Sequence, residues 1–331
     1  MGEMRQNRIT GEWVIHAPER GKRPHQYGNG QSSASQRPQR REDCPFCPGN
    51  ENLLPPILMQ LPEEQKDRWQ IRVVPNKFPA LTPEKGPERS SAAMSIRMPG
   101  YGRQEVIIEH PRHDLDPSGM SEMEVRRLVD AYRLRYRTAL EDRNINMVLI
   151  FRNHGARAGT SLRHPHSQLI ASHVVPAHVR ARERIAQRYY DYWGRCLLCE
   201  LLARECEERR RVVMETPGFT AFVPFAAEVP FEVWIVPRSH QADFASITSE
   251  ERSGLARCLK EMLRRIREKL GDPDYNYIIN SSVRYKEEEP QLHWWLQIRP
   301  RLVTPAGFEI GSGMRINPTL PEENAEILRG H

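Results

Sequence analysis

Two histidines and a neutral amide stand close together in residues 164–168, His-Pro-His-Ser-Gln. Side chains that alternate along an extended strand point to the same face, so His164, His166 and Gln168 are predicted to face one space. Just before them, Gly155 and Gly159 are small enough to let backbone N–H groups approach an anionic oxygen closely. This combination of imidazole, amide and accessible backbone favours chemistry on a phosphate.

Each half of the chain also carries a Cys-x-x-Cys pair followed by two histidines. The first set is Cys44, Cys47, His113 and His164, and the second set is Cys196, Cys199, His240 and His293. Two thiolates and two imidazoles complete a tetrahedral zinc site with no open position, which is typical of a structural metal. A lone Cys-x-x-Cys could be a redox pair or a coincidence. Because the same ligand order occurs twice, the sequence favours two structural zinc sites.

The chemistry then depends on which histidine stays free. If His164 binds zinc, His166 lies roughly 6–7 Å further along the same face, too far to share a metal bond of about 2 Å. The alternative is that both histidines are metal ligands or buried core residues. A free neutral imidazole can attack phosphorus, whereas the amide of Gln168 can hold a phosphoryl oxygen but cannot protonate a poor leaving group. The pattern favours transfer between phosphates over hydrolysis.

The elements that must position these groups occur twice in the same order. In each half, a strand ending in histidine precedes a helix with a capping box, a further strand and the motif itself. The capping boxes are Ser121 with Glu124 and Thr248 with Glu251. The counterpart of His166 in the second half is Trp295, although His293 and Gln297 keep the spacing of His164 and Gln168. The sequence therefore predicts a duplicated scaffold in which only the first half has a catalytic site.

Composition limits the possible partners and location of the protein but does not identify its function. The 331 residues carry a net charge of +6, which is compatible with nucleic acid, with a phosphate-rich small substrate or with a salt-bridged surface. Acids are interleaved with the basic residues, and no aromatic-basic RNA-binding signature is present, so we expect no nucleic-acid partner. No apolar run approaches the roughly 18 residues of a membrane span, and the N-terminus lacks a signal-like stretch. We expect a cytoplasmic protein with no membrane partner.

Together these motifs resemble the galactose-1-phosphate uridylyltransferase family of the histidine triad superfamily. The matching stretches are residues 13–15, 18–24, 44–47, 74–81, 151–156, 164–168 and 307–313. Ser167 stands where the family usually has Gly, and Lys77 stands where it usually has Asp. The ADP-glucose phosphorylase branch of plants is similar in carrying Ser at the first of these positions and a second Cys-x-x-Cys.

The resemblance implies a ping-pong nucleotidyl transfer in which His166 attacks the α-phosphorus of a nucleoside diphosphate sugar while Gln168 steadies the phosphoryl oxygens. The implied phosphate or nucleotide contacts are Arg20, Arg23, Asn153, Gly159 and Ser161. The implied base and ribose contacts are Asn76 and Phe78, and the implied hexose contacts are Phe308, Glu309 and Gly311. The family also implies a possible homodimer.

The expected fold is α+β, with two fused histidine-triad-like halves whose mainly antiparallel strands form one continuous sheet with helices packed on it. The halves are predicted as residues 1–175, with the active-site motif and one zinc site, and 176–331, with the second zinc site.

The function we expect is exchange of UMP between UDP-glucose and galactose 1-phosphate, a reaction of galactose metabolism. The alternative is an ADP-glucose phosphorylase that uses inorganic phosphate as the acceptor. The remaining hypotheses are a histidine triad nucleotide hydrolase and a zinc-stabilised nucleic-acid-binding module.

Overall fold

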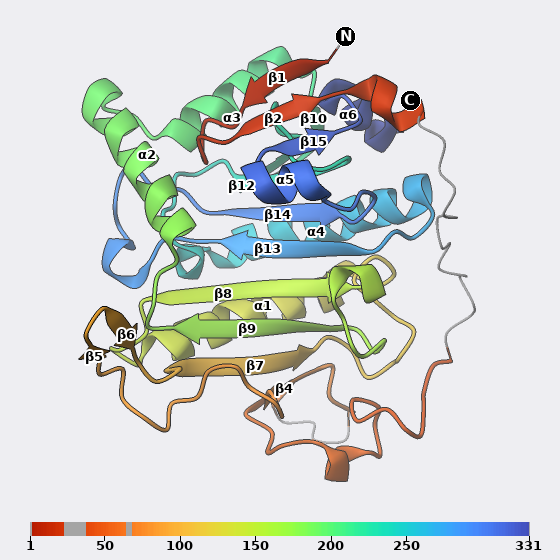
Figure 1. Cartoon of the computed structure of the whole chain (residues 1–331). Coiled ribbons are helices and arrows are strands. Elements are labelled where there is room, and N and C mark those ends of the chain that lie inside the picture. The colour runs from red at the N-terminus through yellow and green to blue at the C-terminus, as the bar shows by residue number, and fades with distance from the viewer. Residues whose placement is uncertain (1, 23–37, 64–67, 331) are drawn as a thin grey trace.

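A single sheet of ten strands runs through both halves of the protein (Figure 1). The structure is a computed structural model that describes residues 2–22, 38–63 and 68–330. The strand order is β10-β11-β12-β14-β13-β8-β9-β7-β4-β3, and every neighbouring pair is antiparallel. The predicted α+β fold with one continuous sheet is confirmed.

Each half contributes five strands to this sheet. The first half supplies β3 (Met59–Leu61), β4 (Ile71–Pro75), β7 (Gly102–Ile108), β8 (Met147–His154) and β9 (His166–Ser172). The second half supplies β10 (Val212–Thr216), β11 (Phe219–Phe222), β12 (Val233–Pro237), β13 (Tyr275–Asn280) and β14 (Trp295–Pro300). The halves join where β13 pairs with β8, from Tyr275 opposite His154 to Ile279 opposite Ile150.

Two long helices, α1 (Glu122–Leu140) and α4 (Ser249–Leu270), cover one face of the sheet, behind the strands in Figure 1. Both begin with the predicted capping boxes, in which side chain and backbone satisfy each other's free groups at the helix start. Their apolar faces and the sheet form one hydrophobic core that spans both halves. The duplicated scaffold therefore shares one large core, beside which each half has a smaller hydrophobic cluster near its Cys/His group.

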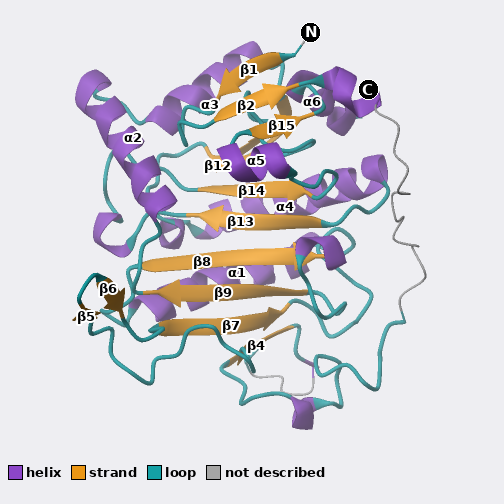
Figure 2. Cartoon of the chain, viewed as in Figure 1, coloured by secondary structure: helices purple, strands orange, loops and turns teal. Residues whose placement is uncertain are grey.

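Shorter elements lie on the opposite face and at the edges of the sheet (Figure 2). The helices are α2 (Ala177–Trp193), α3 (Leu197–Glu208), α5 (Gly307–Ser312) and α6 (Pro321–Arg329). A small sheet contains β1 (Glu3–Gln6), β2 (Trp13–His16) and β15 (Arg315–Asn317), and β5 (Ser90–Ala92) pairs with β6 (Ser95–Arg97). Helix α2 was not among the predicted elements. No helix in the described residues is long and apolar enough to cross a membrane.

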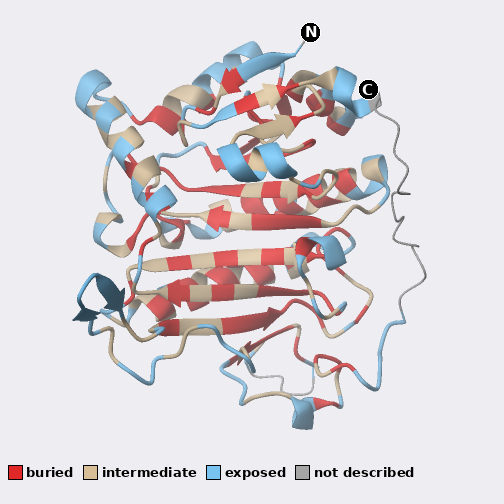
Figure 3. Ribbon diagram, in the orientation of Figure 1, coloured by how far each residue is buried: buried red, intermediate tan, exposed pale blue. Residues whose placement is uncertain are grey.

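The two faces of β8 differ in how far they are covered. Buried and partly buried residues alternate along β8 (Figure 3), so one face packs on the core and the other is only partly enclosed. The strands predicted to end at His113 and His240 in fact end at Ile108 and Pro237, and the two histidines lie in the following turns. Pro111 lacks the N–H needed for a ladder, so regular pairing could not have continued through it to His113.

Candidate active site and metal clusters

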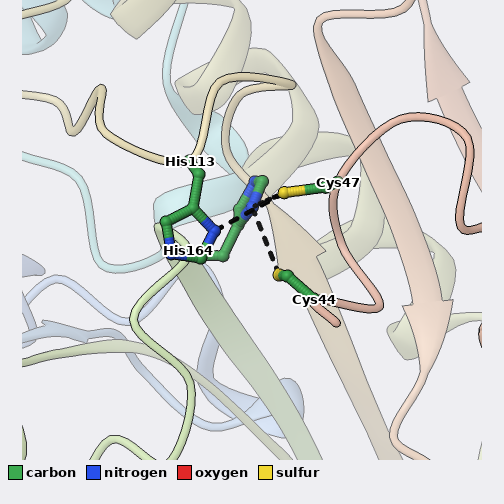
Figure 4. A group of neighbouring side chains, drawn as sticks. All are labelled: Cys44, Cys47, His113 and His164. Carbon is green, nitrogen blue, oxygen red and sulfur yellow. Dashed lines mark hydrogen bonds between the residues drawn. The ribbon is translucent and has the colours of Figure 1, made fainter. Parts of the chain in front are cut away.

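The first predicted ligand set comes together beside the start of β9 (Figure 4). The Sγ atom of Cys47 lies 3.5 Å from Nδ1 of His113 and 3.5 Å from Nδ1 of His164. The Sγ atom of Cys44 lies 3.7 Å from Nδ1 of His164. Ligand atoms bonded to one zinc at about 2.0–2.3 Å would be separated by distances of this size. All four side chains are buried, so this cluster could hold a metal ion closed to substrate.

The second predicted set forms a similar cluster in the other half. Cys199 Sγ lies 3.4 Å from Nδ1 of His240 and 3.3 Å from Nδ1 of His293, with Cys196 in the same group. This cluster is less enclosed, because His240 is exposed and Cys199 is only partly buried. Thiol and imidazole donors in equal number suit the same class of metal at both clusters.

His166 lies outside both clusters and is the first residue of β9. Its Nδ1 lies 2.8 Å from the carbonyl oxygen of His164, so Nδ1–H donates there and the free lone pair is on Nε2. Burial lowers the pKa of His166, while the His164 carbonyl and the charge of Glu109 act in the opposite direction. The ring is therefore a neutral imidazole of fixed tautomer, the form that can act as a nucleophile.

Gln168 follows His166 on the same face of β9. Its Oε1 accepts hydrogen bonds from Nε2 of Gln104 at 2.9 Å and from Nδ2 of Asn76 at 3.5 Å. The intervening Ser167 points to the opposite face, where it meets Tyr132 of α1. Because Oε1 is already occupied, the amide of Gln168 has its N–H groups left to donate to an oxygen on the His166 face.

The glycine-containing loop is held by a residue of the second half. Gly155 adopts a φ of +84°, and a Cβ placed there would lie 1.8 Å from Oδ1 of Asp274. The other oxygen of Asp274 accepts the backbone N–H of Arg157 at 2.6 Å. Glycine is required at position 155 both for its backbone conformation and for this close approach.

Asn276 of β13 bonds to the same loop and to the end of β8. Its Nδ2 donates to Oδ1 of Asn153 at 2.8 Å and to the carbonyl of Ala158 at 2.9 Å. Its Oδ1 in turn accepts from Nε of Arg301 at 2.5 Å. Sequence reasoning missed both Asp274 and Asn276, because nothing in the sequence shows that β13 lies beside β8.

A buried polar network behind His166 was also missed. Ser167 donates to Glu109, which accepts from Nε of Arg152 at 2.9 Å, and Nη1 of Arg152 donates to the hydroxyl of Tyr275 at 2.7 Å. Burial opposes the charge on Arg152, but the neighbouring Glu109 holds its pKa well above the usual value. The signal available in the sequence was a pair of opposite charges within otherwise apolar strands, which are seldom buried unless paired.

The other residues predicted to contact the nucleotide and its phosphates lie in several parts of the structure. Gly159 and Ser161 lie exposed in the loop before β9, Asn76 contacts Gln168, and Phe78 nearby is 84% exposed. Arg20 lies exposed in the short helix Pro18–Lys22, whereas Arg23 falls outside the described residues.

The predicted hexose contacts Phe308, Glu309 and Gly311 lie on α5, in front of β14 and β12 in Figure 1. Strands β13 and β8 separate β14 from β9 in the sheet order, and neighbouring strands are about 4.8 Å apart. These three residues therefore belong to a part of the fold next to β14, whereas His166 begins β9.

The chain is similar to proteins of one family along nearly its whole length. Models of the N-terminal and C-terminal domains of galactose-1-phosphate uridyl transferase match residues 1–176 and 182–318. An ADP-glucose phosphorylase of Arabidopsis thaliana is 36% identical over 99% of this chain and 92% of that protein. A galactose-1-phosphate uridylyltransferase of Thermotoga maritima is 30% identical over 99% of this chain and 98% of that protein.

A solved structure is similar over the whole chain. The crystal structure of an Arabidopsis thaliana ADP-glucose phosphorylase with bound ADP-glucose has a TM-score of 0.86 at 34% identity, and the match covers 100% of this chain and 99% of that chain.

Proposed function

We propose that this chain, which belongs to the galactose-1-phosphate uridyl transferase family, transfers a nucleotidyl group through a covalent bond to Nε2 of His166. The observation that carries the proposal is the position of His166. It stands outside both metal clusters, and its Nδ1–H is bonded to the His164 carbonyl, so Nε2 is the available nucleophile.

In the first step, the Nε2 lone pair forms a bond to the α-phosphorus of the nucleoside diphosphate sugar. The bond from that phosphorus to the bridging oxygen breaks, and the hexose 1-phosphate leaves with the electron pair. The proton on Nδ1 stays in place, so the His164 carbonyl stabilises the positive ring that results. The N–H groups of Gln168 donate to a non-bridging oxygen as negative charge develops there.

In the second step, an oxygen of an incoming phosphate attacks the same phosphorus and the bond to Nε2 breaks. A hexose 1-phosphate acceptor gives a new nucleoside diphosphate sugar, and inorganic phosphate gives a nucleoside diphosphate. Because phosphates are good leaving groups, neither step needs a strong proton donor, in agreement with an amide at position 168.

The donor we propose first is UDP-glucose, with galactose 1-phosphate as the acceptor. The second candidate is ADP-glucose, with inorganic phosphate as the acceptor. It is supported by the higher identity to the Arabidopsis ADP-glucose phosphorylase, 36% against 30% for the Thermotoga uridylyltransferase. Ser167 matches the ADP-glucose phosphorylase branch, and Lys77 stands where the family usually has Asp, between the proposed base and ribose contacts Asn76 and Phe78.

Incubation with each nucleotide sugar in the absence of acceptor tests both candidates. The intact protein is expected to gain the mass of UMP from UDP-glucose, or of AMP from ADP-glucose, and His166→Asn should gain neither. The mechanism is rejected by the absence of any adduct, or by an adduct that persists in the variant.

We also propose zinc as the metal of both clusters, with Cys44, Cys47, His113 and His164 holding one ion and Cys196, Cys199, His240 and His293 the other. A zinc bound by four protein ligands supplies structural stability. Metal analysis of the purified protein should find two zinc ions per chain, and a folded protein without zinc would contradict this. The division into residues 1–175 and 176–331 and the cytoplasmic location stay predictions.

We also propose that the protein forms the homodimer implied by the family and that α5 of the second copy completes the site, because α5 of the same chain lies next to β14 (Figure 1) and His166 begins β9. A mixture of His166→Asn and Phe308→Ala chains tests it, because a mixed dimer would contain one intact site. Partial recovery of activity on mixing two impaired variants is expected, whereas no recovery after confirmed subunit exchange would reject a shared site.

A further inference from the structure

A small cavity lies in the second half, between α2 and the start of β14. The space open to the centres of water molecules is about 40 Å³. One water needs roughly 10–15 Å³ of such space, so the cavity has room for about three. Four of its lining side chains have a buried polar atom with no hydrogen-bond partner among the described residues. These atoms are Oε1 of Glu183, Oγ of Ser282, Nε2 of His293 and Nε1 of Trp295.

Buried polar groups are almost always hydrogen-bonded, so four such atoms around one cavity indicate a bound polar occupant. Trp295 can only donate, and Ser282 can both donate and accept. His293 turns Nδ1 toward Cys199 at 3.3 Å, which leaves Nε2 as its N–H donor. Glu183 supplies an acceptor. Water satisfies this mixture of donors and acceptors, whereas a small anion would face the carboxyl of Glu183.

The corresponding atom of the first half has a protein partner. Nε2 of His164 lies 2.7 Å from the carbonyl oxygen of His110, a bond that fixes the orientation of the ring. No such carbonyl is bonded to His293 among the described residues. The two metal clusters therefore differ in how their shared histidine is supported.

We propose that this cavity binds a short chain of water molecules linking Nε2–H of His293 to Oε1 of Glu183, and that Glu183 is thereby a positioning residue for the second metal cluster. The inference rests on the proposed metal at that cluster. Arg182, the preceding residue of α2, fixes the helix over the site. Its guanidinium carbon lies 4.7 Å from the ring centre of Trp295, and its Nη1 donates to Oδ1 of Asn280 at 2.9 Å.

Zinc competition with a chromophoric chelator tests the role of Glu183. Glu183→Leu removes the acceptor and should weaken zinc binding at the second cluster by about tenfold or more, with the first cluster unchanged. Glu183→Gln keeps an acceptor oxygen and should recover most of the affinity. Asp191→Asn removes a carboxylate from the exposed end of the same helix and should have no effect. Equal zinc affinity in Glu183→Leu and Asp191→Asn would overturn the proposal.

A crystal structure of the zinc-loaded wild type gives an independent test that does not depend on a variant folding. Ordered water within hydrogen-bond distance of both His293 Nε2 and Glu183 Oε1 supports the proposal. An anion in the cavity, or direct protein partners for both atoms, overturns it. Absence of zinc from the second cluster, with the water chain present, would instead reject the proposed metal and leave the hydrated cavity standing.

Discussion

The starts of β9 and β14 occupy matching places in the two halves, but only β9 begins with a histidine. Each strand begins two residues after a histidine of a metal cluster, with His166 in the first half and Trp295 in the second. His166 is flanked by the loop that Asp274 and Asn276 hold in place. Trp295 instead packs on Trp234, with ring centres 5.3 Å apart, and lies under Arg182 of α2.

The comparison of the two halves shows which features support the fold and which features are specific to the proposed reaction. Both halves keep the Cys-x-x-Cys pair, the two cluster histidines and the capped helix, because these features support the fold whether or not a reaction takes place. The second half has Trp295 in place of the imidazole. It contributes Asp274 and Asn276, which hold the loop of the first half in position. The second half therefore supports the loop beside the nucleophile that we propose in the first half.

Replacement of His166, the proposed nucleophile, should cause the largest loss of transfer activity. His166→Asn keeps a polar side chain of similar size but has no ring nitrogen to attack phosphorus. Transfer activity is expected to fall by at least about 10³-fold. The measurement is steady-state exchange between nucleotide sugar and acceptor, with circular dichroism to show that the variant is folded. Retention of a tenth of the activity or more would assign the nucleophile elsewhere.

Displacement of the loop that Asp274 holds should cause the next largest loss of activity. Gly155→Ala places a Cβ 1.8 Å from Asp274 Oδ1 and must displace the loop. A shift of this kind should lower kcat/KM by roughly 10²-fold. Gly194→Ala is the matched control, since Gly194 also has a positive φ, +66°, but a Cβ there meets nothing within 4 Å. Equal losses of activity in the two variants would show that backbone strain alone is responsible.

Restoration of the missing imidazole should not create a second site. In a His166→Asn background, Trp295→His is expected to give no nucleotidyl adduct, because α2 covers position 295. Loss of the buried indole should cost roughly 3 kcal/mol of stability. Intact-mass measurement and chemical denaturation check the two parts. An adduct formed by the double variant would mean that the second half lacks only the imidazole.

The clusters themselves should differ in how fast they release metal. A chelator is expected to remove the ion of the second cluster first, because His240 is exposed and Cys199 partly exposed, whereas all four ligands of the first cluster are buried. Two phases should appear in the absorbance of the metal–chelator complex. The faster phase should disappear in Cys199→Ser, and loss of the slower phase instead would reverse the assignment.

Several features could be predicted from the sequence because they depend on local chemistry. The capping boxes at Ser121 and Thr248 are local backbone motifs, and both are present. The repeat of ligand spacings predicted both Cys/His groups, and the structure brings each group close enough together to hold a metal ion. Alternation along a strand placed His166 and Gln168 on one face, opposite Ser167.

Other features depend on contacts between distant parts of the chain. Helix α2 was not predicted, and neither was its position over Trp295. The pairing of Glu109 with Arg152 joins residues 43 positions apart, and the sequence gives no indication of which opposite charges meet in the core.

By itself the sequence identified the candidates for metal ligation and for attack on phosphorus, because residue type and spacing along one strand or turn limit what a side chain can reach. Only the tertiary structure decided that His166 would be supported by Asp274 and Asn276 from the other half, and that His293 would face a cavity where His164 meets a carbonyl. The physical reason is that such contacts depend on which strands become neighbours in the sheet. That choice is governed by burial of the whole core, which no single motif specifies.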